Sequence, residues 1–406
     1  MNELVSPPPL SVAAAEPVVF SGERREFRHL VIRGAMLELV TLGFYRFWLA
    51  TDMRRHLWSH TSAGGDHLEY TGTGKELLIG FLFALAVLVP IYVVYFLIGL
   101  QAEQAQAFAS IPLVIFFYLF AQFAMYRARR YRLTRTIWRG VRFWMDGSGW
   151  SYAWRAALWG LFGIITLGIA LPWRAAALER FKMRHSHYGD LQGRFDATGG
   201  QLFKRIWWLW VAGPVALVLL GVLAAVLTEK AGPVAGPVIV TILTFLLMIA
   251  GMLFIYPVYK AIEWRWWASG IRFGDVRFES KLTAGRLIGL YLKVVGWFLL
   301  LILILSIVVF TAVTLLASPG SLEGLTPETL LRQQTPILIV SVVAYVITAL
   351  ALTAIIRIYL MRDLWARIAT STTIYNLSAA DNVTAKGQAA GALGEGLADS
   401  LDVGGF

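Results

Sequence analysis

Six long apolar segments constrain this chain more than any other feature of its sequence. They cover residues 77–99, 109–126, 206–227, 234–257, 287–316 and 337–361. A helix needs about 20 mostly apolar residues to cross the hydrocarbon core of a bilayer. The composition agrees, because 58% of the residues are hydrophobic and only 15% are charged, against about 25% charged in ordinary globular proteins. The sequence therefore predicts a polytopic membrane protein with six spanning helices.

The basic residues predict the side of the membrane on which each connection lies. Short cytoplasmic loops collect Lys and Arg. Of the 36 Lys and Arg residues, only Lys230 and Arg332 fall in the connections 100–108, 228–233 and 317–336. The remaining stretches and both termini are therefore predicted to be cytoplasmic. This distribution also accounts for the net charge of +11 without nucleic acid, since no nucleic-acid-binding signature accompanies it.

Two further apolar segments, residues 30–49 and 154–173, are shorter and contain glycines. Basic residues flank each of them on both sides, so a single crossing would leave one basic flank outside. We therefore predict two re-entrant segments, each breaking near a Thr-Leu-Gly at residues 41–43 and 166–168. The alternative is that both segments span the membrane, which would give eight helices with one cytoplasmic stretch displaced to the outside.

These two segments belong to a duplicated unit, with copies at about 30–78 and 155–203. An ungapped offset of 125 residues aligns Trp48 with Trp173, Arg55 with Arg180, His60 with His185 and Gly64 with Gly189. Each copy contains an apolar segment, a basic helix, a short aromatic strand and a glycine turn. The sequence therefore predicts internal repeats with the same orientation.

Short strand-like pieces follow the basic helices at 67–70, 141–145, 193–195, 271–278 and 373–377, and another precedes them at 18–20. Isolated strands of this length are unstable in water, so we expect them to pair into a small cytoplasmic sheet. The predicted class is an all-α polytopic membrane protein with six spanning helices, two re-entrant segments, internal repeats and short cytoplasmic strands. The predicted organisation is a disordered tail (1–17), a membrane domain (18–376) and a Gly/Ala-rich tail (377–406).

The re-entrant segments supply the first set of candidate site residues. Ionisable residues at membrane depth are costly and are candidates for function, and Glu38 is such a residue. The turning points would line a cavity that opens to the cytoplasm if the protein transports a solute. The candidates are Glu38, Thr41, Gly43, Thr166 and Gly168.

A second set could bind anionic lipid headgroups. Indole rings prefer the headgroup level, and neighbouring Lys and Arg can meet lipid phosphates. Of 16 tryptophans, all except Trp297 fall near the predicted cytoplasmic interface. The candidates are Arg54, Arg55, Arg139, Arg142, Arg180, Trp207, Trp208, Trp266 and Trp267. The alternative is ordinary interfacial anchoring without a dedicated lipid site.

The sequence contains no pattern that predicts an enzyme or a cofactor site. The chain has no cysteine, which excludes thiolate chemistry and cysteine-ligated metals. His56 and His60 are spaced four apart and could share a metal, but no Asp, Glu or Cys completes a set in the linear sequence, so no metal is expected.

Several stretches resemble the YjgN-like family of bacterial inner-membrane proteins, a domain of unknown function. They are Phe20-Ser21-Gly22, Leu39 to Trp48, Arg54-Arg55, Leu68 to Gly72, Tyr131, Thr136 to Phe143 and Gly394 to Asp399. The resemblance spans about residues 18 to 406. It implies an inner-membrane location and carries over no catalytic or binding residues.

Two functions are therefore predicted. The first is a transporter or channel with a cavity at the Thr-Leu-Gly segments. The second is a non-transporting, membrane-organising protein that binds anionic lipid or a partner through its basic, Trp-rich cytoplasmic layer. Membrane lipids are the expected partners in either case, and the oligomeric state and any cytoplasmic protein partner are left open.

Overall fold

The computed structural model describes residues 15–101, 106–316 and 327–387. Its helices are α1 (Arg24–Val40), α2 (Arg46–Ser59), α3 (Gly74–Gln101), α4 (Gln106–Thr134), α5 (Gly149–Ile165), α6 (Leu171–Arg184), α7 (Gly199–Ile206), α8 (Trp208–Ala250), α9 (Tyr256–Gly270), α10 (Ala284–Leu316), α11 (Pro327–Ile355) and α12 (Leu364–Thr370). π-helical turns η2 (Gly251–Ile255) and η3 (Ile356–Asp363) precede α9 and α12, and the short 3₁₀ helix η4 (Leu377–Ala380) follows the last strand.

The strands lie between the helices. They are β1 (Ala15–Pro17), β2 (Val19–Phe20), β3 (Thr61–Ala63), β4 (Asp66–Tyr70), β5 (Thr136–Trp138), β6 (Val141–Met145), β7 (Ser186–Tyr188), β8 (Leu191–Phe195), β9 (Ile271–Phe273), β10 (Val276–Ser280) and β11 (Thr372–Tyr375). Within the described residues they form one 11-stranded sheet, in the order β1-β11-β10-β9-β8-β7-β6-β5-β4-β3-β2. Every pairing is antiparallel.

The N-terminal segment closes this sheet into a barrel-like ring. β1 and β2 are consecutive parts of one extended stretch, separated only by Val18. β1 pairs with β11 and β2 pairs with β3, and the Val18 N–H donates to the carbonyl of Thr372 at 3.0 Å. The two ends of the sheet therefore meet in one strand.

The predicted all-α class is wrong for this reason. The short strands were expected to be a minor addition to a helical bundle, but β3 to β11 each pair on both sides, and β1 and β2 join the two ends into a nearly closed sheet. Closure removes the unpaired edges that make short strands unstable. Two-residue turns support the pairing, since Gly64-Gly65 and Arg139-Gly140 have positive φ at both central positions, as type I′ hairpins require.

A single unit repeats around the ring: an entry helix, a β-hairpin and an exit helix. In the described part of the chain four such units follow one another, and the fifth is assembled from β11 at one end and β1–β2 at the other. A backbone hydrogen bond of the same kind occurs at each contact between neighbouring units. The donor is the N–H of the residue that follows the second strand of one unit, and the acceptor is the carbonyl of the residue that precedes the first strand of the next unit. These bonds, 2.8–3.0 Å long, join Ser21 to His60, Thr71 to Arg135, Asp146 to His185, Asp196 to Gly270 and Lys281 to Ser371. The predicted duplication is therefore part of a higher repeat.

Helical hairpins connect the units, and some are long enough to cross a membrane. Among the described residues six helical stretches have that length and apolar character: Gly74–Leu97, Ile111–Thr134, Gly199–Gly232, Val234–Gly270, Ala284–Thr311 and Leu338–Thr370. They correspond to the six predicted segments and make the chain a multi-pass membrane protein. Gly232, with φ 84°, forms the reversal within α8.

The predicted re-entrant segments form the short hairpins α1–α2 and α5–α6. Each reverses at its Thr-Leu-Gly, where Leu42, Gly43, Leu167 and Gly168 have positive φ. Both ends of each hairpin join the barrel, so the chain returns to the side from which it left, and the predicted break is confirmed. Depth of entry into a bilayer stays a prediction.

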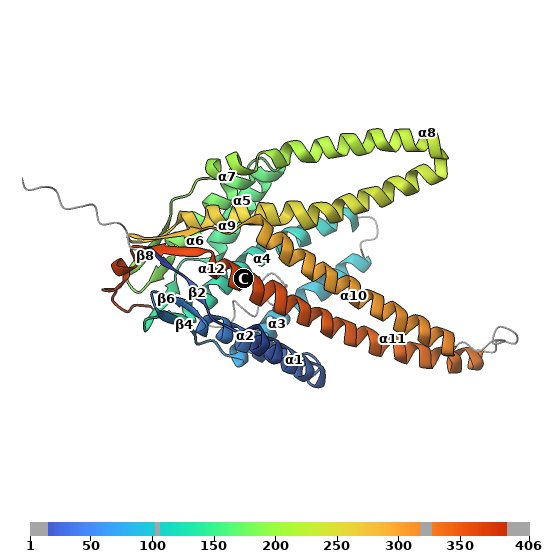
Figure 1. Cartoon of the computed structure of the whole chain (residues 1–406), viewed down its shortest axis with the longest axis horizontal. Coiled ribbons are helices and arrows are strands. Elements are labelled where there is room, and N and C mark those ends of the chain that lie inside the picture. Colours follow the sequence, from blue (N-terminus) through green and yellow to red (C-terminus); the bar gives the residue numbers. More distant parts are fainter. Residues whose placement is uncertain (1–14, 102–105, 317–326, 388–406) are drawn as a thin grey trace, which may run out of the picture.

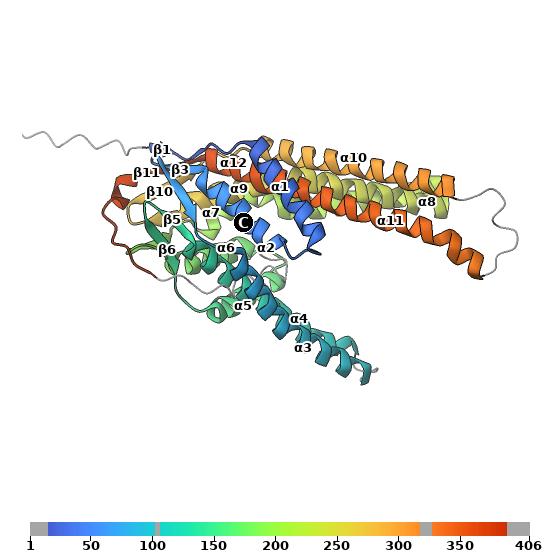
Figure 2. The same ribbon diagram turned by 90° about the horizontal axis from the view of Figure 1, so that it is seen from below.

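The helical hairpins splay away from one face of the barrel (Figure 1). The α3–α4 hairpin diverges from α8, α10 and α11 (Figure 2), and no more than 28% of the apolar window of any of these six stretches is buried within the protein. Their apolar surfaces are therefore left for lipid.

The barrel interior is a packed apolar core. Its cluster contains Ala63, Trp138, Tyr188, Val276 and Ile374, contributed by strands around the ring. After β11 the chain crosses the turn end of the barrel. Its hydrogen bonds there join Asn376 to Asp275, Asp381 to Arg139 and Thr384 to Asp190. Residues 1–14 and 388–406 of the predicted tails lie outside the described residues, while 15–17 form β1.

Candidate functional site

A groove of about 440 Å³ runs along the short α1–α2 hairpin. Its polar lining includes two carboxylates, two guanidiniums and two imidazoles, from Glu26, Asp52, Arg33, Arg55, His29 and His56. The groove therefore offers charged groups of both signs and donors as well as acceptors. This chemistry suits a small polar or charged ligand.

Three side chains meet at the barrel end of this groove. Glu26 is the third residue of α1, His56 lies in the last turn of α2, and His60 is the C-cap of α2. One ligand-type atom from each lies within 4.8 Å of the others. Glu26 Oε2 is 3.9 Å from His60 Nε2, and the two imidazole centroids are 4.2 Å apart. We call these residues the Glu–His–His cluster.

The hydrogen bonds of the two imidazoles differ. His60 Nδ1 lies 2.7 Å from the carbonyl of His56, so this nitrogen donates, and Nε2 is the ring nitrogen that faces Glu26. His56 Nε2 is buried without a hydrogen-bond partner among the described residues. Burial lowers the pKa of His56, and the charges of His60 and Arg362 lower it further, against an opposing effect of Glu26. The neutral imidazole is therefore favoured.

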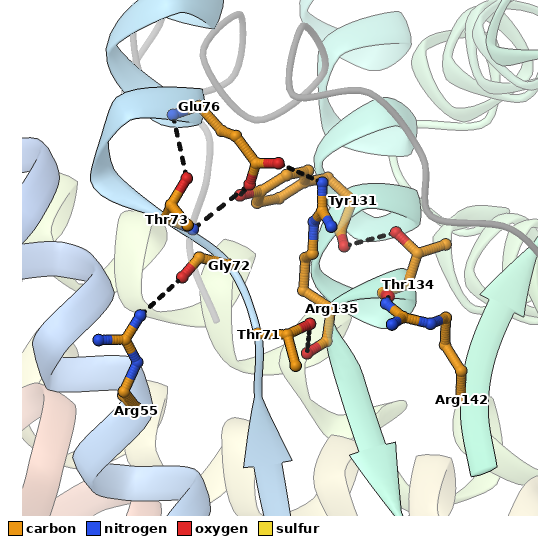
Figure 3. Close-up of polar contacts among 9 residues, drawn as sticks. All are labelled: Arg55, Thr71, Gly72, Thr73, Glu76, Tyr131, Thr134, Arg135 and Arg142. Atoms are coloured by element: carbon orange, nitrogen blue, oxygen red, sulfur yellow. Dashed lines mark hydrogen bonds and ion pairs between the residues drawn. The ribbon is translucent and has the colours of Figure 1, made fainter. Parts of the chain in front are cut away.

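The equivalent positions at the base of the α3–α4 hairpin hold a closed ion pair. Glu76 is the third residue of α3, and Tyr131 and Arg135 occupy the places of His56 and His60. The Tyr131 hydroxyl donates to Glu76 Oε2 at 2.8 Å, and Arg135 donates to Glu76 Oε1 (Figure 3). The Thr73 N–H donates to the same carboxylate at 3.3 Å. Glu76 therefore accepts from Tyr131 in α4 and from Arg135 and Thr73, which adjoin the ends of α4 and α3.

Neighbouring polar groups join this base to the barrel. Thr71 bonds the carbonyl of Arg135, Arg55 donates to the carbonyl of Gly72 at 3.1 Å, and Arg142 donates to the carbonyl of Thr134 at 2.5 Å (Figure 3). Two lipid-headgroup candidates, Arg55 and Arg142, are thus engaged in internal contacts.

Glu26 and Glu76 are each the third residue of the helix that follows the second strand of a unit. The third residue of α5, α7 and α10 is not a carboxylate. Ser151, Gln201 and Arg286 stand there in α5, α7 and α10. At the base of α5–α6, His185 occupies the position of His60, but its Nδ1 lies 2.7 Å from Asp146 Oδ1 on the preceding loop. Within the described residues, the combination of one carboxylate with two imidazoles is particular to the α1–α2 base.

The predicted Thr-Leu-Gly candidates are turn residues. The Thr41 hydroxyl donates to the Leu37 carbonyl at 2.7 Å and accepts from the Tyr45 N–H at 3.0 Å. Thr166 makes the same two bonds, at 2.8 and 3.1 Å. Gly43 and Gly168 provide positive φ, at 89° and 85°. The repeated Thr-Leu-Gly motif is therefore explained by the turn that it forms, in which the Thr hydroxyl caps the backbone and the Gly adopts positive φ.

Gly168 also borders a second pocket, of about 320 Å³. Its lining is mostly apolar and comes from the α5–α6 turn and from α6, α7, α8 and α9: Leu167, Leu171, Pro172, Leu202, Ile206, Leu209, Trp210 and Tyr259. Thr41 and Thr166 line neither of these two pockets.

Glu38 forms a bidentate ion pair with Arg357. The guanidinium Nη1 and Nη2 lie 2.7 and 2.8 Å from the two carboxylate oxygens. Glu38 comes from α1 and Arg357 from the π-helical turn η3, so the pair joins the short N-terminal hairpin to a membrane helix. Both side chains are largely buried.

The remaining lipid-headgroup candidates fall into two groups. Internal contacts occupy Arg139, which bridges Asp66 and Asp381, Trp266, which donates to the Thr198 carbonyl, and Trp267, which donates to Glu179. By contrast, Arg180 and Trp207 are exposed and Trp208 is half-buried. Arg54 donates to the Tyr70 hydroxyl at 3.3 Å.

Glu26 is the site residue that sequence reasoning missed. The signal was an offset of 50 residues, which aligns Ser21-Gly22 and Glu26 with Thr71-Gly72 and Glu76. The same offset relates the starts of α1 and α3. It indicates that Glu26 lies at the base of the α1–α2 hairpin, as Glu76 lies at the base of the α3–α4 hairpin.

The comparisons with known proteins identify a family. A family model described as a bacterial protein of unknown function (DUF898) matches residues 15–400. The predicted YjgN-like resemblance is consistent with this match. No curated protein and no solved structure matches the chain.

Proposed function

The chain belongs to this bacterial family, and from that premise we propose that it is a membrane-organising protein of the inner membrane. In this proposal both termini are cytoplasmic and three helical hairpins cross the bilayer. The two short hairpins enter only the cytoplasmic leaflet, and basic and indole side chains beside them hold anionic lipid headgroups. The role is non-catalytic.

The tips of the short hairpins carry this proposal. Leu42 and Leu167 are 89% and 87% exposed, and their φ values are 52° and 50°. Left-handed backbone costs a residue with a side chain about 1–2 kcal/mol, and Gly or Asn is the usual choice. An exposed leucine there would be unfavourable in water on both counts. In a bilayer the same side chain is well solvated, which supports lipid contact at both tips.

A headgroup-binding surface is supported at the break between α7 and α8. Lys204, Arg205 and Trp207 are exposed there, and Trp208 is half-buried. Indole rings favour the bilayer interface, and each Lys or Arg near an anionic surface contributes about 1 kcal/mol. We call Lys204, Arg205, Trp207 and Trp208 the α7–α8 belt.

The geometry supports this role better than transport. Transport was expected to need a polar cavity at Thr41 and Thr166, but these hydroxyls cap turns. The barrel interior is filled by Trp138, Tyr188 and other apolar side chains, so it offers a solute no polar path.

A cysteine scan tests entry into the leaflet, because the native chain has no cysteine. Leu42→Cys and Leu167→Cys are labelled singly with an environment-sensitive fluorophore in lipid nanodiscs. Both labels are expected to show blue-shifted emission and quenching by spin-labelled lipid. Glu69→Cys, on the exposed face of β4, is the matched control and is expected to show neither. Emission from the two tips equal to that of the control would contradict the proposal.

The same scan in intact cells tests orientation. An impermeant thiol reagent added outside is expected to leave Leu42→Cys and Arg54→Cys unlabelled. Labelling at position 54 would place a basic flank outside and exclude re-entry.

Lipid selectivity tests the α7–α8 belt. Because two charges contribute about 2 kcal/mol at an anionic surface, the double variant Lys204→Gln/Arg205→Gln is expected to bind phosphatidylglycerol about 30-fold more weakly. Native mass spectrometry in detergent measures the change. Arg194→Gln/Arg277→Gln removes the same charge from exposed strand positions and is expected to bind like the native chain. Equal loss in both doubles would point to net charge alone.

A further inference from the structure

We propose that Glu26, His56 and His60 form a binding site for a divalent cation of the Zn²⁺ class at the base of the α1–α2 hairpin. The site is separate from the lipid contacts proposed above and does not depend on them. Its three donors come from α1, which follows the closing strand β1–β2, and from the C-terminal end of α2, which precedes β3.

The spacing of the donors fits such a cation after a small contraction. Zn²⁺ binds imidazole nitrogen and carboxylate oxygen at about 2.0–2.2 Å in tetrahedral geometry, which places neighbouring donors about 3.3–3.6 Å apart. Glu26 Oε2 and His60 Nε2 are 3.9 Å apart, and the donor atoms of all three residues lie within 4.8 Å of one another. Glu26 is exposed, so its side chain has room to rotate toward the imidazoles.

The hydrogen bonds of the two imidazoles leave one ring nitrogen of each available as a ligand. A metal-binding histidine usually donates its other ring N–H to a carbonyl or carboxylate, which fixes the ligating nitrogen. The bond from His60 Nδ1 to the His56 carbonyl, at 2.7 Å, has this form. His56 Nε2 is buried with no partner among the described residues. A cation would give this nitrogen the partner that buried polar atoms normally have.

Glycine leaves space beside the two rings. A Cβ at Gly22 would lie 3.3 Å from His56 Nε2 and 3.2 Å from the His60 Cβ. The guanidinium of Arg362 also acts electrostatically on His56. Its charge is balanced by Asp363, 2.7 Å away, and it also donates to the Gly22 carbonyl.

The α3–α4 base shows which interactions a cation would substitute for at the α1–α2 base. There the carboxylate of Glu76 is neutralised by Arg135 and bonded by Tyr131 (Figure 3). At the α1–α2 base both donors are replaced by imidazoles, and within the described part of the chain no Lys or Arg pairs with Glu26. A divalent cation would supply the missing positive charge and hold the two helices together as the ion pair does.

Three protein ligands leave a fourth position for water. The cluster lies at one end of the α1–α2 groove, and His29 and Asp52 also line that groove. The cation would therefore join α1 to α2 and remain accessible from solution.

Metal binding by the purified full-length protein tests the proposal. After removal of any affinity tag, the protein is dialysed against Zn²⁺ and its bound metal is measured, with Co²⁺ absorption as the probe of tetrahedral geometry. One ion per chain is expected. Loss of an outer-shell partner alone weakens metal binding about 10–100-fold, so Glu26→Gln and His60→Gln, which each remove a ligand, are expected to weaken it by at least 100-fold. His67→Gln, an exposed histidine on β4, is expected to bind as the native chain does.

A transplant of the α3–α4 chemistry is the sharpest variant. His56→Tyr/His60→Arg is expected to fold without metal, because it recreates the donors that satisfy Glu76, and to bind no Zn²⁺. Its melting temperature is expected to be insensitive to Zn²⁺, whereas that of the native protein rises. Zn²⁺ binding by this double variant at native affinity would overturn the proposal, as would a native protein that binds no ion or that loses its ion only with His67→Gln. If the double variant does not fold, the two single ligand variants decide by the same measurement.

Discussion

Arg357→Leu is expected to destabilise the protein by about 3–5 kcal/mol, because removing one partner of a buried ion pair leaves an uncompensated charge. In this variant Glu38 would lose both of its guanidinium bonds, at 2.7 and 2.8 Å. Arg357 lies within the apolar stretch Leu338–Thr370, so water has little access to replace it. Equilibrium unfolding in mixed micelles measures the loss.

The double variant Glu38→Leu/Arg357→Leu is the control for this effect. Replacing a whole buried pair by apolar residues is often neutral or stabilising, so the double variant is expected to recover most of the lost stability. A double variant as unstable as the single one would mean that packing, and not the unpaired charge, sets the loss. Either result bears on the predicted functional role of Glu38, because a structural pair tolerates the double replacement.

Val18→Pro is expected to open the ring, because proline removes a hydrogen bond of the sheet and leaving a buried carbonyl unpaired costs about 1–3 kcal/mol. Val18 lies between β1 and β2, and its N–H donates to Thr372 at 3.0 Å. Proline has no N–H to donate, and within a closed sheet there is no free edge to accommodate it. Thermal unfolding and size-exclusion profiles of the detergent-solubilised protein report the loss.

Val18→Ala separates the hydrogen bond from the side chain. Val18 also packs against the barrel core, so alanine is expected to cost about 1 kcal/mol for the lost methyl groups while keeping the bond. If alanine and proline lower stability equally, the closing hydrogen bond does not hold the ring and the packing of Val18 does.

Local signals allowed much of the membrane region to be predicted. Each spanning helix is recognisable from a continuous apolar run, and this signal does not depend on residues elsewhere in the chain. The breaks at Thr41 and Thr166 were predictable for a similar reason, because Thr-Leu-Gly provides both a capping hydroxyl and a glycine at positive φ. The basic flanks then indicated that the chain returns to its starting side.

Long-range pairing explains what could not be predicted. Each strand has only two to five residues, too few for a pattern to reveal its partners in the sheet. The fifth unit of the ring has no contiguous sequence, since β11 lies at one end of the chain and β1–β2 at the other. The Glu–His–His cluster was missed for a related reason, because Glu26 lies 30 residues or more from His56 and His60 in the sequence and meets them only when α1 packs beside α2.

The closing strand also sets the order in which the molecule is built during synthesis. β2 meets its partner β3 soon after both have left the ribosome, but β1 waits for β11, which begins at Thr372. At about 5–20 residues per second this interval is roughly 20–70 s. Throughout that time the other helical hairpins are entering the bilayer while β1 has no strand partner. The newborn chain therefore completes its ring only when its final strand emerges, so a truncated product lacks the seam that joins its beginning to its end.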